Sequence, residues 1–302
     1  MICKNTYKLI FTSAVILLLF TLFACTAGGN PEEIAPTGPD SGSGTASSSS
    51  GAVQSSNDVD SSDVDDFGGD SLAAWVSVPA MTLSRAGVTY SIDGFKMIEA
   101  EVTQGLYAKM MGDIPGQNYT GDNYPVENVN WFQAALFCNE YSKYLGLDTA
   151  YTYTSVGDKY FLENLVIDYG VESIRLPTEM EWEIAAHGGT TTTYYWENEV
   201  ASKYAYYGQS KGPVEVAGRL ANAFDLYDMA GNVAEWVNDW YGAFPTKAMD
   251  NYTGATSGTA RVIRGGGWSD PIKECAPDVR EKKDPIYASH MLGFRVVYSK
   301  GF

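Results

Sequence analysis

Histidine is nearly absent from this 302-residue chain, which has only His187 and His290. Two histidines cannot build the three-histidine sites of many zinc and iron enzymes, and there is no His-Glu-x-x-His helix. The sequence also has no Gly-x-Ser-x-Gly elbow, no phosphate-binding Gly-Lys-Ser/Thr loop and no dinucleotide-binding fingerprint. These absences weigh against a hydrolase, a nucleoside triphosphatase and a dehydrogenase.

Basic residues are scarce as well. The chain has 20 lysines and arginines against 37 aspartates and glutamates, a net charge of −17. So strong an excess of negative charge disfavours nucleic acid and anionic lipid surfaces as partners. We therefore expect no nucleic-acid partner, and any attachment to a membrane must come from a covalent lipid.

Cysteine is too rare for a disulfide framework. Of the four cysteines, Cys3 lies within the first 24 residues and Cys25 directly follows them, which leaves Cys138 and Cys275 in the rest of the chain. Cys138 falls on the apolar face of a predicted helix, so a small buried hydrophobe is the better interpretation than a reactive thiol. Whether it pairs with Cys275 stays open at this point.

The first 24 residues have the pattern of a signal peptide. Lys4 and Lys8 precede an apolar run from Leu9 to Phe23, too short to favour a membrane-spanning helix. The closing "LFAC" resembles the lipobox of bacterial lipoproteins, with Cys25 as the lipidated residue. Phe23 departs from the strict pattern, so ordinary cleavage is the alternative. The sequence predicts an exported, lipid-anchored protein at the outer membrane or surface of a bacterium.

Residues 25–70 are rich in Gly, Ser and Pro, with nine acidic residues and no Lys or Arg. Such a segment has almost nothing to bury, so we predict a flexible tether. The remaining residues, 71–302, suffice for one domain with a substantial core.

Two helices are predicted in this domain. "NVNWFQAALFCNEYSKYLGL" begins at Asn130 as N-cap and ends at Gly146. "RLPTEMEWEIAAHGG" carries a Thr178–Glu181 capping box and ends at Gly188. Glu179 and Glu183 share one helix face, and a solvated face is favoured over paired acid–base carboxylates. With short strands and long aromatic-rich loops between them, these helices indicate an α+β domain.

Six motifs together carry a resemblance to a known family. They are "EVTQGLY", "YPVENVNWFQAALFCN", "RLPTEMEWEIAAHGG", "NAFDLYDMAGNVAEWVNDWY", "RVIRGGGW" and "LGFRVV". In order and wording they resemble the formylglycine-generating-enzyme-like (sulfatase-modifying factor) family, from about Val76 to Val297. The resemblance implies a C-type-lectin-like α+β domain with a small twisted antiparallel sheet, two helices and extensive loops.

The enzymes of that family oxidise a sulfatase cysteine to formylglycine with copper held by two cysteines. Counted from Trp268, the two positions are Asp270 and Cys275 here, so one thiolate is missing. A carboxylate is a poor substitute for a thiolate on Cu(I). We therefore expect no copper, and a copper-dependent oxidase with Cys275 as its catalytic residue is the alternative interpretation.

The resemblance also implies a calcium site in the loop "DMAGNVAEW". The matching positions are Asp228 and Glu235 by side chain, and Gly231 and Val233 by backbone carbonyl, a ligand mixture that suits Ca²⁺. The family's usual tryptophan before the glutamate is Ala234 here. The alternative is a loop held only by packing of Trp236 and Trp240.

The segment from Trp268 to Met291 is a long insertion without apolar periodicity between two strand-like segments. It resembles the variable proteins of diversity-generating retroelements, whose ligand-binding segment is rewritten inside a fixed frame. That frame is kept here at the expected spacing: Trp268, Cys275, Arg280, Pro285, Gly293, Phe294 and Arg295. The resemblance implies that the heterogeneous positions between them bind a ligand: Ser269, Asp270, Pro271, Lys273, Glu274, Asp278, Lys282, Lys283, Tyr287, Ser289, His290 and Met291.

The sequence thus favours a non-catalytic, surface-displayed binding protein for a protein or other extracellular ligand that it does not identify. A fixed structural lipoprotein with the same fold is the further alternative.

Overall fold

The computed structural model describes residues 72–302. The predicted signal peptide, the lipidation site at Cys25 and the whole predicted tether lie outside the described residues. No helix within residues 72–302 is long and apolar enough to cross a lipid bilayer.

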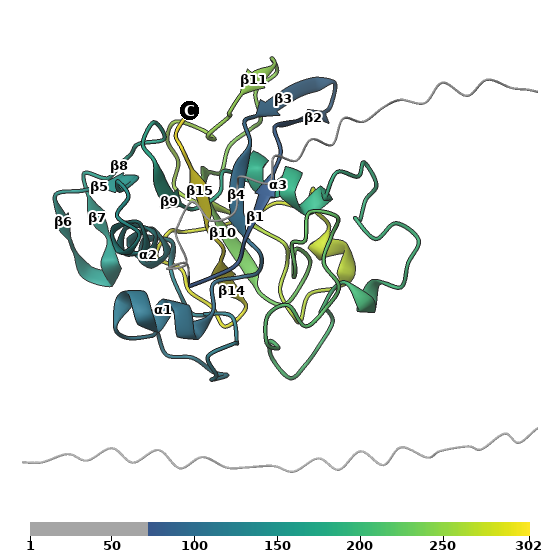
Figure 1. Cartoon of the computed structure of the whole chain (residues 1–302), viewed down its shortest axis with the longest axis horizontal. Coiled ribbons are helices and arrows are strands. Elements are labelled where there is room, and N and C mark those ends of the chain that lie inside the picture. Colours follow the sequence, from purple (N-terminus) through teal and green to yellow (C-terminus); the bar gives the residue numbers. More distant parts are fainter. Residues whose placement is uncertain (1–71) are drawn as a thin grey trace, which may run out of the picture. The chain divides into compact units, whose positions relative to one another are not determined.

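Within residues 72–302, three α-helices lie among several small sheets (Figure 1). The helices are α1 (Gln104–Met111), α2 (Trp131–Tyr144) and α3 (Glu179–His187). The strands are β1 (Trp75–Val78), β2 (Met81–Arg85), β3 (Val88–Ile92), β4 (Phe95–Ile98), β5 (Tyr151–Thr152), β6 (Ser155–Val156), β7 (Leu162–Glu163), β8 (Val166–Ile167), β9 (Ser173–Arg175), β10 (Ala234–Trp240), β11 (Met249–Asp250), β12 (Arg261–Arg264), β13 (Glu281–Lys283), β14 (Leu292–Phe294) and β15 (Val297–Ser299).

Both predicted helices form where their capping residues place them. Asn130 accepts from the Gln133 amide at 2.9 Å, and the Gln133 side chain accepts from the Asn130 amide at 3.0 Å. Thr178 and Glu181 make the same reciprocal pair, and Gly188 ends α3 in the left-handed region at φ 56°. These local signals needed no tertiary contact to be recognised.

The prediction of only two helices was wrong. The N-cap of α1 is Thr103, whose hydroxyl accepts from the Leu106 amide at 3.2 Å. A helix of eight residues has too few turns to show a clear apolar period, and isolated helices of this length are marginal. Burial of Leu106 and Tyr107 in the core stabilises it instead.

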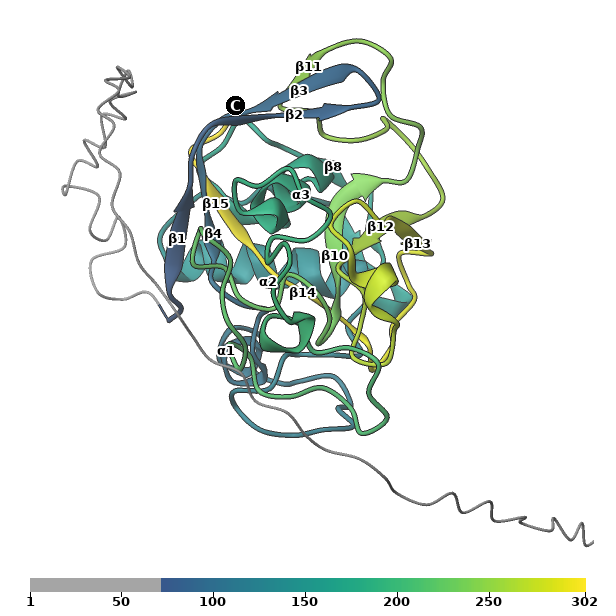
Figure 2. The same ribbon diagram turned by 90° about the vertical axis from the view of Figure 1, so that its right-hand side faces the viewer.

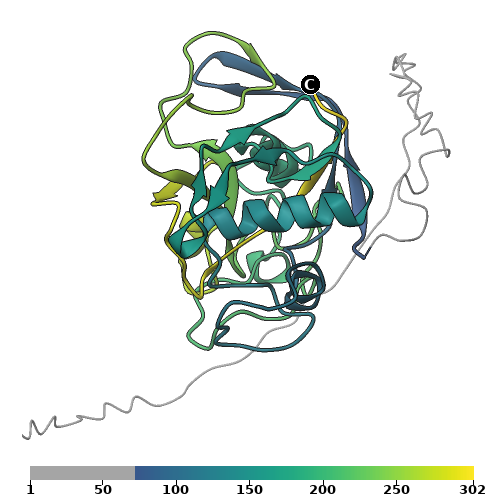
Figure 3. The ribbon, with the colours of Figure 1, turned by 90° about the vertical axis from the view of Figure 1, so that its left-hand side faces the viewer.

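The strands form several separate sheets, whereas the resemblance implied one small antiparallel sheet. One has the order β1-β4-β15-β9, and a second has β13-β12-β10-β14, in which β10 and β14 run parallel. A third, β11-β3-β2, extends beyond α3 at the top of Figure 2. Two two-stranded sheets, β5–β8 and β6–β7, lie beside α2, which crosses the face seen in Figure 3.

Two groups of buried side chains form the core. The first surrounds α2, where Phe137 packs against Phe294 with ring centroids 5.2 Å apart. The second surrounds α3 and includes Trp182 and Cys275. Cys138 is buried in the first group, so its predicted inward position is confirmed, and both cysteines are free thiols.

Candidate ligand-binding surface

The segment 268–291 is held mainly through its backbone. Outside groups donate to its carbonyls: the Gly208 amide to Asp270, the Gln209 amide to Trp268 and the Trp131 amide to Pro285, at 2.7–3.0 Å. The Tyr194 hydroxyl reaches the Ile272 carbonyl at 3.1 Å. Such bonds require nothing of the segment's own side chains.

Its middle, from Pro277 to Arg280, is held by buried ion pairs with α3. Arg264 donates to the carbonyls of Pro277 and Val279 at 2.7 and 2.6 Å and pairs with Glu183. Arg280 donates two hydrogen bonds to the Glu179 carboxylate, at 2.5 and 2.6 Å. The prediction of a solvated face for Glu179 and Glu183 was wrong, because these arginines from distant strands and turns bury both carboxylates.

The frame and the interior of the segment differ in burial. Trp268, Cys275, Pro285, Gly293, Phe294 and Arg295 are buried, and Arg280 is mostly so. None of the twelve predicted binding positions is buried. The segment is also less irregular than its sequence suggests, because a short 3₁₀ turn spans Ile272–Cys275 and β13 pairs with β12.

The predicted binding residues do not all converge on one place. Five of them line a cavity of about 210 Å³: Asp270, Lys283, Tyr287, Ser289 and Met291. Asp278 lines a different cavity, of about 520 Å³, beside His187 and Arg85. Lys273 and Lys282 lie on exposed surface, with the Lys282 ammonium 4.7 Å from the Tyr241 ring.

The floor of the 210 Å³ cavity consists of residues that the sequence did not assign to the site. Ala234, Ile263 and Leu292 come from the three adjacent strands β10, β12 and β14, and Glu281 lies at its edge. The family usually has tryptophan at the position of Ala234. This difference was the one feature of the sequence that could have indicated the cavity floor. A tryptophan at this position would occupy space that is open here.

Some predicted positions also have structural contacts. The Asp270 carboxylate accepts from the Gly267 amide at 2.8 Å, and the Ser289 hydroxyl accepts from the Met291 amide at 3.2 Å. The Trp268 indole donates to the His290 carbonyl at 3.2 Å. Replacing Asp270 or Ser289 therefore removes a bond that shapes the segment, whereas replacing Lys273 or Lys282 does not.

The proposed calcium ligands do not fit a calcium site. Both Glu235 oxygens accept hydrogen bonds from Arg295 at 2.8–3.0 Å, and one also accepts from the Trp182 indole at 2.7 Å. Asp228 accepts from the Ala217 amide at 2.6 Å, and burial raises the pKa of its carboxyl. Calcium takes six to eight oxygens, and Arg295 already neutralises Glu235.

Within residues 72–302 there is no cluster of three or more His, Cys, Asp or Glu side chains suited to a metal ion. The calcium site therefore stays a prediction that these contacts disfavour.

The thiol at the second family copper position is enclosed. Burial raises the pKa of Cys275 to about 12, and Asp270 and Glu274 add to the rise. Metals bind the thiolate, which this environment disfavours at neutral pH. Asp270, at the first position, is engaged with Gly267.

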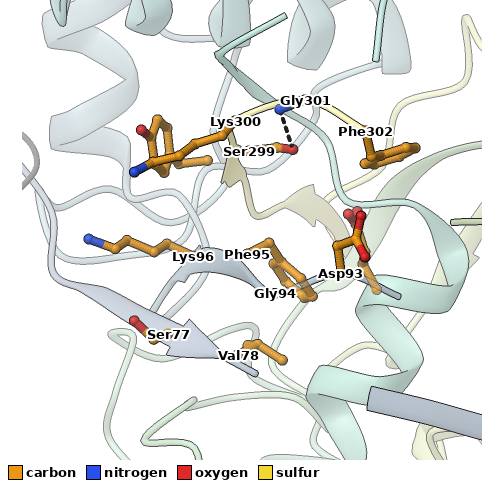
Figure 4. A pocket seen from close by; sticks show the side chains of 12 residues that line it. Ser77, Val78, Asp93, Gly94, Phe95, Lys96, Ser299, Lys300, Gly301 and Phe302 are labelled. Atoms are coloured by element: carbon orange, nitrogen blue, oxygen red, sulfur yellow. Dashed lines mark hydrogen bonds between the residues drawn. The ribbon is translucent and has the colours of Figure 1, made fainter. Parts of the chain in front are cut away.

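His187 is the last residue of α3, and burial lowers the pKa of its imidazole. Another cavity, of about 290 Å³, lies away from the segment between β4 and the C-terminal residues. In Figure 4, Lys96 and Lys300 occupy one side of it, and Asp93 and Phe302 the other. None of the twelve predicted binding residues lines it.

Comparison with known proteins identifies the family. Residues 68–300 match the sulfatase-modifying factor enzyme 1-like domain. The chain belongs to this family. The solved structure of Treponema denticola variable protein 1 is 33% identical, with a TM-score of 0.67, and the match covers 74% of this chain and 94% of that one. The C-type-lectin-like fold class predicted from the motifs is thereby confirmed.

Two curated relatives within the family have different descriptions. The chaperone protein LppX of Paenibacillus barcinonensis is 29% identical over 240 residues, which are 70% of this chain and 82% of LppX. The formylglycine-generating enzyme of Mus musculus is 28% identical over 193 residues, 57% of this chain and 44% of the enzyme. Membership of the sulfatase-modifying factor enzyme 1-like family therefore does not by itself decide between catalysis and binding.

Proposed function

We propose that this protein is a non-catalytic, lipid-anchored binding protein displayed outside a bacterial cell, and that segment 268–291 is its binding surface. We further propose that the segment is diversified by a retroelement. The likeness to Treponema denticola variable protein 1, which covers 94% of that chain, supports this role. The accessible surface around the 210 Å³ cavity offers mixed charges, hydroxyls and one exposed tyrosine to a ligand.

One observation carries the proposal: the groups that hold the segment in place are mostly different from the side chains that it exposes. Carbonyls and frame residues hold most of the segment, and of the predicted binding side chains, which all remain accessible, Asp270 and Ser289 also make hydrogen bonds that shape it. Surface substitutions of this kind usually change stability by no more than about 0.5 kcal/mol. The interior of the segment can therefore change while the fold persists, which is the requirement for a diversified binding surface.

Stability measurements on single variants test this separation. We expect Lys273→Ala, Lys282→Ala and Tyr287→Ala to keep the free energy of unfolding within about 0.5 kcal/mol of wild type. The frame variant Trp268→Ala is the matched control, and its cost should be about 3–5 kcal/mol because it empties buried volume. Losses of 2 kcal/mol or more in the three surface variants, about as large as in the control, would contradict the proposal.

Diversification is tested at the level of the gene. The 3′ end is sequenced from many independent cultures, and the flanking DNA is searched for a near-copy of codons 268–291. Substitutions confined to these codons and located at adenines of the copy support the proposal. An invariant segment without a nearby copy rejects diversification and leaves a binding protein with a fixed surface.

Copper-dependent oxidation is the second candidate, because Cys275 occupies one of the family's two copper positions. It predicts stoichiometric Cu(I) binding that the Cys275→Ser variant abolishes, together with oxygen uptake on a cysteine-containing peptide. With one thiol enclosed and Asp270 bound to Gly267, we expect neither result.

A further inference from the structure

Arg261 is a buried arginine without a carboxylate partner. Only 2% of it is exposed, and its guanidinium carbon lies 3.8 Å from the ring centroid of Trp131 and 3.6 Å from that of Trp240. Nη1 donates to the Asn238 carbonyl at 2.5 Å, and Nε has no partner. Within residues 72–302 no carboxylate lies within ion-pair distance of Arg261.

The other buried arginines of the described domain are all paired. Arg175 pairs with Glu181, Arg264 with Glu179 and Glu183, and Arg295 with Glu235. Burying a charge without a counter-ion is unfavourable, so such a side chain is rarely retained without one. Arg261 departs from the pattern that the rest of this core follows.

Nearby ionisable groups do not supply the missing charge. Burial lowers the pKa of Arg261 to about 10, which still leaves the guanidinium protonated at neutral pH. Asp239 acts on Arg261 electrostatically, but burial and then Glu179 raise the pKa of Asp239 well above its ordinary value. Asp239 accepts from the Glu179 amide at 2.8 Å and makes no ion pair with Arg261, so the guanidinium has no carboxylate partner within residues 72–302.

The same arginine lines a cavity of about 300 Å³ between β8 and the loop that follows β11. Leu165, Ile167 and the Trp240 ring give it apolar walls, and Thr253 and Thr256 add hydroxyls. This volume is at the lower end of the roughly 300–1,000 Å³ typical of small-molecule sites. A cation, hydroxyls and an aromatic wall in one cavity suit an anion with a hydrocarbon part.

We propose that this cavity binds a small organic carboxylate, whose carboxyl group pairs with Arg261 and whose hydrocarbon part packs against Trp240, Leu165 and Ile167. A carboxylate is favoured over a phosphate because its planar pair of oxygens matches one edge of a guanidinium held between two indole rings. The site is separate from segment 268–291, since none of the twelve predicted binding residues lines it.

Titration calorimetry of the mature chain with phenylacetate is the first test. Phenylacetamide, the neutral isostere, should bind at least about tenfold more weakly, because it cannot form the charge-assisted pair. Sodium sulfate should give no saturable heat. Equal affinity for the acid and the amide overturns the proposal, as does no binding of phenylacetate up to about 20 mM, where a site of even weak affinity would be occupied.

An acidic side chain of a protein partner has the same chemistry, and N-acetyl-aspartate amide represents that source. Binding of this compound without binding of phenylacetate overturns the small-molecule proposal in favour of a peptide ligand.

Two variants locate the site. Arg261→Gln keeps a planar side chain between the indoles but removes the charge, and phenylacetate affinity should fall at least about tenfold. In case this variant does not fold, Thr256→Trp blocks the cavity from the exposed loop without touching Arg261, and binding should be lost. Thr259→Trp, also exposed but outside the cavity, is the matched control and should bind as wild type. Unchanged affinity in Thr256→Trp overturns the assignment.

Discussion

Removing the charge of Glu179 is expected to loosen the middle of segment 268–291, around residues 276–283. Glu179 is fully buried and is bound by Arg280 through two hydrogen bonds of 2.5 and 2.6 Å and by Arg264 at 3.2 Å. In Glu179→Gln, Arg264 retains Glu183, whereas Arg280 loses its only carboxylate partner among the described residues.

Breaking a buried ion pair on one side costs about 3–5 kcal/mol. The Arg280 side chain is 15% exposed and can turn partly toward water, so the lower end, about 3 kcal/mol, is expected.

Urea denaturation at neutral pH measures this loss, with Glu140→Gln as the control. Glu140 pairs with Lys143 on the exposed side of α2 at 2.7 Å, and such a pair contributes about 0.5 kcal/mol or less. Hydrogen exchange should show protection lost first in residues 276–283, because their backbone depends on Arg264 and Arg280. A loss below about 1 kcal/mol, comparable to the control, would refute the assignment of these ion pairs as the support of the segment.

Two further variants test the packing and the charges of the core. Gly231→Ala should lower the free energy of unfolding by at least about 2 kcal/mol in thermal denaturation, because Gly231 has φ 87° and an added Cβ would clash with the Tyr206 carbonyl. Gly116→Ala is the control and should change stability little, because the added Cβ has free space. Burial raises the pKa of Asp239, so its cost to the folded state is absent below about pH 4, grows from there up to the raised pKa and is constant above it. Asp239→Asn should therefore match wild-type stability at pH 4 and exceed it at pH 8, and a difference independent of pH would contradict this.

Only part of the candidate binding surface could be predicted from the sequence. The frame residues were recognised from their resemblance to a known family pattern, and their burial agrees with that role. The floor of the cavity was not recognised, because Ala234, Ile263 and Leu292 become neighbours only when β10, β12 and β14 assemble. Equally, spacing alone could not show that Asp278 turns toward a different cavity.

The sequence by itself determined the features that depend on neighbours within a few residues. The capping boxes at Asn130 and Thr178 and the glycine after α3 are local hydrogen-bond and backbone preferences, so they were visible without the fold.

Only the tertiary structure decided which charged groups are buried and which partners they pair with. Glu183 is buried because Arg264 reaches it from a strand 81 residues away, and Glu235 is neutralised by Arg295 across 60 residues. The physical reason is that the free energy of a buried charge depends on which partners the fold brings to it, and distant partners leave no periodic pattern in the sequence.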